Sequence, residues 1–387
     1  MRKKKLKIAV YAISKNEEKH VARFCEAAKE ADMIVIADTG STDATVELAK
    51  KHGAIVHNIL VTPWRFDVAR NTALSLVPGD VDVCVSMDLD EILQPGWRDV
   101  IEKAWKEDTT RIGYNFDNGD QFVFMQNKIH ARSGYVWKWI CHEWPMPYRI
   151  TEVCETVDFV MAKHKPDTGK CRKQYLDLIY ACAIEEPESA RHSMYYAREL
   201  YQQGYYEQAI SEFTRLLSLK EATEASDRGY AYRMLSRASH HLGRYQDALT
   251  YARKCTAEDP HTRESWCALA WECSAQNLWP ECLSAAMTAL GIEKRVNIHH
   301  NEDDAWRETP HDLAAKAYKQ LGLNNLAKEQ EDLSKSFKEK DKPDERSSSP
   351  AEDQAGSGPE GRHHDVPHKR RRVQAGKRKR GRSKVSA

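Results

Sequence analysis

The sequence predicts an α/β domain followed by an all-α domain, and three observations support this. Short runs rich in β-branched residues alternate with amphipathic stretches through the first hundred residues. Apolar positions then recur at helical spacing from Pro166 to about Lys338, and beyond that point the sequence contains almost no large apolar residue. We therefore expect domains at 1–170 and 171–338, and a disordered tail at 339–387 that cannot bury enough surface to fold.

The first domain is predicted to contain a mostly parallel sheet. Strands are expected at 6–14, 33–40, 54–61 and 80–93, with helices between them at 16–31, 42–53 and 65–77. This strand-helix-strand order is typical of βαβ units. From about 110 to 165 the pattern changes to aromatic-rich β-like segments without a helical period. These segments indicate a mixed or antiparallel extension of the same sheet.

Charge and cysteine content limit the class of protein. The 387-residue chain has a net charge of +1, but residues 369–384 contain ten Lys and Arg and no Asp or Glu, which leaves −9 for the remainder. No window approaches the roughly 18 to 20 apolar residues of a membrane helix, so we expect no membrane span. The ten cysteines are scattered, without a C-x-x-C pair, which favours reduced thiols and a cytoplasmic protein, or a nuclear one in a eukaryotic host.

A pair of carboxylates suggests where the chemistry takes place. Asp88 and Asp90 leave an apolar strand two residues apart and therefore on the same side. Open α/β sheets bind their ligands at the carboxyl ends of the strands. Neighbouring carboxylates repel each other unless a cation lies beside them, and Mg²⁺ and Mn²⁺ prefer oxygen ligands together with substrate phosphates. A D-x-D pair by itself is a weak signal.

Four separated motifs strengthen that signal. They are Ser14-Lys15-Asn16-Glu17-Glu18, Asp38-Thr39-Gly40-Ser41-Thr42-Asp43, Ala69-Arg70-Asn71 and Asp88-Leu89-Asp90, each at the end of an expected strand or the start of an expected helix. In this order they resemble the signatures of the family-2 glycosyltransferases with the GT-A fold. The resemblance covers about residues 6–165 and implies a nucleotide-sugar-binding sandwich with a mixed central sheet.

The resemblance also implies roles for individual residues. The nucleotide-sugar site would comprise Ser14, Asn16, Glu17, Asp38, Arg70 and Asp88. Within it, Asp38 resembles the acidic residue held against the base, Glu17 the residue where the first loop meets the nucleoside, and Arg70 the arginine that reaches the base or diphosphate. Asp88 would face the ribose and the metal, and Asp90 would ligate a Mn²⁺ or Mg²⁺ ion that bridges the diphosphate.

Two further residues follow from the same resemblance. Relatives carry a His-Glu pair and a later histidine that completes the metal site, which implies Glu143 as general base and His164 as third metal ligand beside Asp88 and Asp90. Asp117 and Asp120 are competing candidates for the base. The sequence lacks the Q-x-x-R-W motif of processive relatives, which disfavours polysaccharide synthesis.

The second domain contains an internal repeat. Gly204, Gly243 and Asn277 occupy equivalent positions, 39 and then 34 residues apart, in segments of the form G-x-[YW]-x-x-A-[IL]. This period resembles tetratricopeptide (TPR) repeats, whose stacked helix pairs bind peptides or another protomer. The resemblance implies a macromolecular acceptor, a homodimer formed through this domain, or both; an irregular helical bundle is the alternative.

The basic blocks at 369–384 have several possible roles. They suit a nuclear-import signal, or an arm that contacts a nucleic-acid backbone, in which case the acceptor would be a modified base in DNA. A solubilising tail without a catalytic role is equally compatible with the pattern.

Together, these features predict a metal-dependent, inverting glycosyltransferase. It would transfer a sugar from a nucleotide-sugar, expected to be a UDP-sugar, to a hydroxyl or thiol of a peptide, a protein or a modified DNA base. The main alternative is a non-catalytic TPR scaffold that binds a protein partner and, through its tail, nucleic acid. A nucleotidyltransferase is disfavoured because no Gly-rich phosphate loop follows the first strand.

Overall fold

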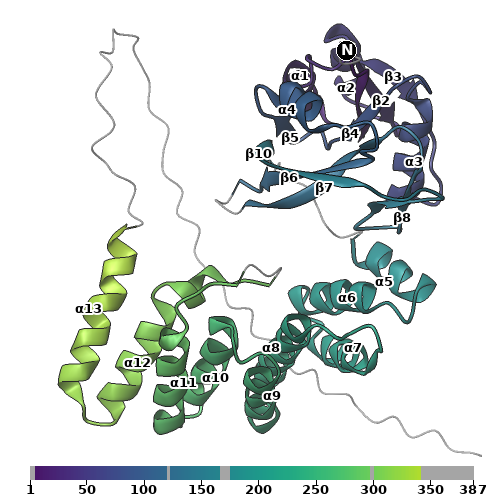
Figure 1. The fold of residues 1–387 in the computed structure, drawn as a ribbon. Coiled ribbons are helices and arrows are strands. Elements are labelled where there is room, and N and C mark those ends of the chain that lie inside the picture. The colour runs from purple at the N-terminus through teal and green to yellow at the C-terminus, as the bar shows by residue number, and fades with distance from the viewer. Residues whose placement is uncertain (1–4, 120–122, 166–174, 297–299, 341–387) are drawn as a thin grey trace, which may run out of the picture. The chain divides into compact units, whose positions relative to one another are not determined.

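The computed structural model describes residues 5–119, 123–165, 175–296 and 300–340. The tail beyond residue 340, with the basic blocks at 369–384, lies outside these ranges, as does Asp120. The described part consists of a sheet with flanking helices followed by consecutive helices (Figure 1).

The first domain is built on one mixed eight-stranded sheet. Its order is β3 (Ile55–Asn58), β2 (Met33–Asp38), β1 (Ile8–Ser14), β4 (Val83–Ser86), β7 (Val123–Ala131), β6 (Arg111–Asp117), β10 (Cys154–His164) and β5 (Glu91–Leu93). Strands β1 to β4 are parallel, whereas β7 runs antiparallel to both β4 and β6. The predicted parallel sheet with a mixed extension is therefore confirmed.

Helices cover both faces of this sheet. On β1, Ile8 and Val10 pack with α1 (Glu18–Ala27) and α4 (Trp97–Ala104), whereas Ala9 and Tyr11 pack with α3 (Phe66–Leu76). Because successive side chains of a strand point to opposite faces, a strand covered on both sides is a continuous apolar run, as β1 is. Trp137 of the hairpin β8 (Tyr135–Lys138) and β9 (Trp144–Pro147) joins the α3 side of the core. The remaining helix of this domain, α2 (Thr45–Lys51), follows β2.

The parallel strands bring their carboxyl ends to one edge. Ser14 at the end of β1 is in register with Asp38 at the end of β2, and β4 runs parallel to β1 on the other side. The loops that follow these three strands carry the predicted nucleotide-sugar motifs. The sheet topology thus gathers motifs that are separated by more than twenty residues in the sequence.

The second domain consists of paired helices. They are α5 (Tyr175–Glu185), α6 (Ala190–Gln202), α7 (Tyr206–Ser218), α8 (Ala225–His241), α9 (Tyr245–Glu258), α10 (Arg263–Ala275), α11 (Trp279–Gly291), α12 (Thr309–Gln320) and α13 (Asn324–Lys340), with a short 3₁₀ helix at Asp303–Trp306. From α6 to α13, each helix packs against the next one in the chain. None of the described helices combines the length and apolar character needed to cross a membrane.

The turns within the pairs explain the repeat seen in the sequence. Gly204, Gly243 and Asn277 all have left-handed backbone conformations, with φ of 81°, 74° and 60°, and Gly322 repeats this between α12 and α13 with φ of 80°. A left-handed residue ends one helix and redirects the chain, and glycine and asparagine adopt this conformation most readily. Residues 190–340 are therefore a TPR-like array of helix pairs, as predicted.

The cysteines of the described ranges are free thiols, and all but Cys154 are buried. Burial raises the pKa of most of them, for Cys84 and Cys267 to about 12. They therefore act as small core residues, in line with their scattered positions.

Gly229 in α8 offers a test of the packing within a helix pair, because its neighbour Asp259 directly follows α9. A Cβ at this position would lie 2.7 Å from Cβ of Asp259, which is too close for two carbon atoms. We expect Gly229→Ala to lower the free energy of unfolding by about 1–3 kcal/mol. Gly291→Ala is the matched control, because a Cβ there meets nothing within 4 Å and removes flexibility from the unfolded chain. Urea unfolding of both variants checks this, and equal stabilities would contradict it.

Candidate functional site

Asp38 organises the loop that follows β2. Its carboxylate accepts hydrogen bonds from Ser14 Oγ (2.8 Å), Ser41 N (2.8 Å) and Gly40 N (3.0 Å), and also from Ser41 Oγ. Burial by itself would raise the pKa of Asp38, but these hydrogen bonds outweigh it and lower the pKa below its ordinary value. Protein donors thus use the lone pairs of this carboxylate, so the predicted contact with a nucleobase requires a hydroxyl of Ser14 or Ser41 to turn away.

The first loop is joined to the second by hydrogen bonds. Asn16 has a left-handed backbone (φ 55°); its N–H donates to Ser41 Oγ at 2.8 Å, and its side-chain oxygen accepts from Thr42 N at 2.8 Å. The N–H of Glu17 donates to Thr45 Oγ1 at 2.6 Å. The structure therefore brings Ser14, Asn16, Glu17 and Asp38 together at one edge of the sheet, as the motifs predicted.

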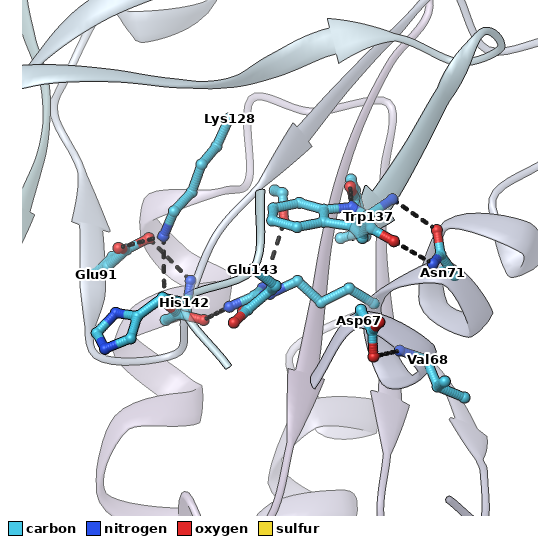
Figure 2. Close-up of polar contacts among 12 residues, drawn as sticks. Asp67, Val68, Asn71, Glu91, Lys128, Trp137, His142 and Glu143 are labelled. Atoms are coloured by element: carbon cyan, nitrogen blue, oxygen red, sulfur yellow. Dashed lines mark hydrogen bonds and ion pairs between the residues drawn. The ribbon is translucent and has the colours of Figure 1, made fainter. Parts of the chain in front are cut away.

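Arg70 links two of the predicted site carboxylates. It extends from α3 and is buried, with its side chain only 5% exposed. Its Nη2 lies 2.5 Å from Asp88 Oδ1. Its Nε donates to Glu143 Oε1, and its guanidinium lies 4.9 Å from the ring centre of Trp137; the side chains of Glu143 and Trp137 are labelled in Figure 2. The neighbouring Asn71 bonds both the N–H and the carbonyl of Trp137, which fixes the β8–β9 hairpin against α3.

Lys128 is a site residue that the sequence did not indicate. Its Nζ lies 3.3 Å from Asp88 Oδ2 and 3.0 Å from Glu91 Oε1, so each oxygen of Asp88 faces a different cation. Lys128 reaches this position because the adjacent Ile129 pairs with Val85, near the end of β4. Nothing in the sequence around Lys128 signals this contact, because it depends on the register between two strands 40 residues apart.

This arrangement keeps Asp88 and Lys128 charged. Burial would raise the pKa of Asp88, but Arg70 and Lys128 hold it well below its usual range. Burial would likewise lower the pKa of Lys128, but Asp88 and Glu91 raise it. For Glu91, burial is the larger effect and raises the pKa. Asp88 is therefore an anion and Lys128 a cation at neutral pH.

Asp90 and His164 form a second pair of polar side chains. His164 Nε2 lies 3.3 Å from Asp90 Oδ2, and their side chains are 28% and 19% exposed. The hydrogen bond with Asp90 raises the pKa of His164 despite its partial burial. The backbone fixes the pair, because His164 is in register with Glu91 across the β10–β5 ladder and Lys165 N donates to the Asp90 carbonyl.

These residues fit a divalent cation in part. Asp90 and His164 offer an oxygen and a nitrogen side by side, and a Mg²⁺ or Mn²⁺ ion can take its other ligands from a diphosphate and water. Both oxygens of Asp88 are instead engaged by cations. Within the described ranges, no group of three His, Cys, Asp or Glu side chains converges as a metal site. The three-ligand site of Asp88, Asp90 and His164 thus stays a prediction, and the geometry supports its Asp90–His164 half.

Asp117, the competing candidate for the base within the described ranges, has partners other than Arg70. It is the last residue of β6, accepts from Gly119 N at 2.9 Å, and lies 3.5 Å from Lys163 Nζ. Glu143, by contrast, contacts Arg70 and through it Asp88. Among these described carboxylates, Glu143 is the one connected to the strand-end site.

Comparison with known proteins agrees with the motifs and the sheet. Residues 10–153 match the family model described as Glycosyl transferase family 2. This part of the chain is therefore similar to family-2 glycosyltransferases. An uncharacterized glycosyltransferase of Rickettsia typhi is 36% identical over 125 residues, which are 32% of this chain and 38% of the relative. A second, from Rickettsia conorii, is also 36% identical over 125 residues, or 32% of this chain and 39% of the relative. The chain thus spans about two fifths of the length of these curated relatives.

Solved structures also resemble part of the chain. MamA from Desulfovibrio magneticus RS-1 matches with 13% identity and a TM-score of 0.37, covering 44% of this chain and 88% of its own. YrrB, described as a TPR protein with an unusual peptide-binding site, matches with 14% identity and a TM-score of 0.34, covering 44% and 79%. Because these scores are low, the description of the second domain rests on its own helix pairs and left-handed turns.

The hydrogen bonds of Asp38 predict a pH-dependent stability. Because they lower its pKa, the ionised carboxylate stabilises the fold fully above its ordinary pKa of about 4, and this stabilisation is lost as the pH falls through the lowered value. We expect Asp38→Asn to cost about 1–3 kcal/mol at pH 7 and less at pH 3, measured by urea unfolding. The control is Asp80→Asn, since Asp80 is 70% exposed and pairs only at the surface, with Lys7. A cost for Asp38→Asn that is equal at both pH values would refute this assignment.

Proposed function

We propose that the protein is an inverting glycosyltransferase that uses a nucleotide-sugar, with a UDP-sugar as the expected donor, and a peptide, protein or modified DNA base as acceptor. The observation that carries this proposal is the convergence of three strand-end loops with Arg70, Asp88 and the Asp90–His164 pair inside the family-2 domain. Separate parts of the chain thereby place two kinds of group at one edge of the sheet. They are hydrogen-bonding groups that suit a nucleoside, and the positive charge of Arg70, which suits a diphosphate.

The donor is bound by groups already positioned at that edge. The loops of Asn16, Glu17 and Asp38 hold the nucleoside, with Asp38 fixing the loop and a hydroxyl of Ser14 or Ser41 turning to admit the base. Arg70 faces the diphosphate, because its guanidinium has N–H donors beyond those that bond Asp88 and Glu143.

A Mn²⁺ or Mg²⁺ ion would be held by Asp90 and His164. When bound, it supplies positive charge that stabilises the leaving nucleoside diphosphate. Asp88 keeps its two cationic partners and accepts from the ribose instead of ligating the ion. The proposed site therefore has two protein ligands, Asp90 and His164, instead of the three that the sequence predicted.

Glu143 takes the proton from the acceptor. Its side chain is 11% exposed, and the contact with Arg70 orients its carboxyl group beside the strand-end site, where a general base is required. The acceptor oxygen attacks the anomeric carbon on the face opposite the diphosphate, the glycosidic bond to the diphosphate breaks, and the configuration inverts. The proton of the attacking hydroxyl passes to Glu143.

The helical array supports a macromolecular acceptor. A cavity of about 370 Å³ lies among α6, α8 and α10, and its lining includes Tyr201, Arg237, His240, Trp271 and Glu302. Aromatic, cationic and anionic groups in one groove suit a polypeptide better than a small sugar. A homodimer through this domain, contact of residues 369–384 with nucleic acid, and a cytoplasmic or nuclear location stay predictions from the sequence.

Metal-dependent donor binding tests the first half of the mechanism. We expect UDP to bind more tightly with Mn²⁺ than without it, and Asp90→Ala to remove this Mn²⁺ effect while the fold is kept, because the ion loses one of two protein ligands. Calorimetric titration of UDP measures this, with the surface variant Asp80→Ala as control. An unchanged Mn²⁺ effect in Asp90→Ala would exclude the metal assignment, and no binding of UDP, GDP or dTDP to the wild type would favour the scaffold alternative.

Substitution of the general base Glu143 tests the second half of the mechanism, which is proton transfer from the acceptor. Glu143→Gln keeps the hydrogen bond from Arg70 but cannot accept a proton, so we expect UDP affinity within about twofold of wild type and UDP release from UDP-glucose or UDP-N-acetylglucosamine slowed about 10²- to 10⁴-fold. Asp117→Asn, at the competing carboxylate, is the matched control and should retain activity. A loss in Asp117→Asn with full activity in Glu143→Gln would transfer the role of base to Asp117.

A further inference from the structure

The loop that carries Glu143 has an unfavourable backbone. Residues 139–143 connect β8 to β9, and two of them, Trp139 (φ 78°) and His142 (φ 53°), adopt the left-handed conformation although both have a Cβ. Each such residue costs about 1–2 kcal/mol relative to an ordinary conformation. Residues of this kind persist only where the surrounding structure holds them, and they are common beside active sites.

Helix α6 holds both of these residues. Arg191 Nη2 donates to the His142 carbonyl at 2.8 Å, and the same guanidinium lies 4.3 Å from the ring centre of Trp139. Tyr195, one turn further along, stacks on the His142 ring with a centroid distance of 4.0 Å and an interplanar angle of 10°. Arg191 also lies 5.0 Å from the Tyr195 ring, so the two helix residues support each other.

Residues at and after α5 hold the rest of the loop. The N–H of Cys141 donates to Cys182 Sγ at 3.4 Å, and Ile140 and Cys141 share an apolar cluster with Ile179 and Cys182 of α5. Just beyond that helix, Glu186 accepts from Trp139 Nε1 at 3.1 Å. Every residue from 139 to 142 therefore has a partner in the first two helices of the second domain or in the turn between them.

We propose that α5 and α6 position the general base, with Arg191 and Tyr195 as positioning residues for Glu143. The inference rests on the proposed function and extends it, since the helical domain then contributes to the chemical step as well as to acceptor binding. The His142 carbonyl belongs to the peptide that leads into Glu143, so rotation of this peptide swings the Glu143 side chain away from Arg70. A shift of about 1 Å in a reacting group can cost about 10²-fold in rate.

The donor loops provide an internal reference. Ser14, Asn16, Asp38 and Ser41 bond to each other within the first domain and do not depend on α6 for these contacts. Loss of Arg191 should therefore slow turnover without weakening donor binding. A general loss of stability would instead lower both turnover and donor binding.

The test compares two arginines of the helical domain in the full-length protein. Arg191→Ala removes the contacts with the 139–143 loop, whereas Arg228→Ala removes a partly buried arginine that pairs with Glu258 and bonds the Leu217 carbonyl, within the array. We expect Arg191→Ala to bind UDP with Mn²⁺ within about twofold of wild type but to release UDP from the same sugar nucleotides 10- to 100-fold more slowly. Arg228→Ala should retain turnover, and Arg191→Lys, which can still donate to the His142 carbonyl, should recover part of it.

Hydrogen exchange supplies a readout that is independent of turnover. We expect the amides of residues 141–143 to exchange faster in Arg191→Ala, with those of residues 14–17 and 38–41 unchanged. Equal turnover of Arg191→Ala and Arg228→Ala, or a parallel loss of UDP affinity and turnover, would overturn the inference. A wild type that neither binds UDP nor releases it from a donor would instead refute the proposed function, and exchange would then still decide whether Arg191 holds the loop.

Discussion

The pairing of Arg70 with two carboxylates is the interaction on which the site depends. A buried guanidinium is costly unless its hydrogen bonds are satisfied, and Asp88 and Glu143 satisfy them from two different parts of the chain. Asp88 comes from the end of β4 and Glu143 from the hairpin that α3 holds through Asn71. The ion pairs of Arg70 therefore hold the end of β4, helix α3 and the β8–β9 hairpin together. The same charge is available to a diphosphate, so structural and functional demands meet in one side chain.

The order of the sheet and the repeat of helix pairs were predictable because both follow from short-range patterns. Alternating strands and helices indicate parallel pairing, and Gly204 and Gly243 mark turns that need a left-handed residue. Motifs located the strand-end residues, including Ser14 and Asp38, since each follows an apolar run directly. The antiparallel insertion of β7 between β4 and β6 was anticipated only as a mixed extension, because pairing between distant strands leaves no local signal.

Contacts across strands and domains could not be derived from the sequence. Lys128 is an ordinary strand lysine until the β4–β7 register places it against Asp88 and Glu91. With Lys128 in place, each oxygen of Asp88 faces a cation, which is why the proposed mechanism assigns metal binding to Asp90 and His164. Arg191 is likewise one of many helix arginines until tertiary packing brings it to the 139–143 loop. In both cases the contact joins residues that are far apart in the sequence. Residue type and spacing predict only contacts between residues a few positions apart.

The helical array has a further consequence, because its helices pack mainly against their neighbours in the chain. Among the described residues of the array, the contacts with the loop that carries Glu143 come from α5, α6 and the turn between them, whereas α12 and α13 lie several helices away along the chain. Repeats at that end can change in sequence or number during evolution without altering the geometry around Glu143. Under the proposed function, the choice of acceptor can thus diversify between related proteins while the transfer chemistry is conserved, provided that α5 and α6 are inherited together with the sheet.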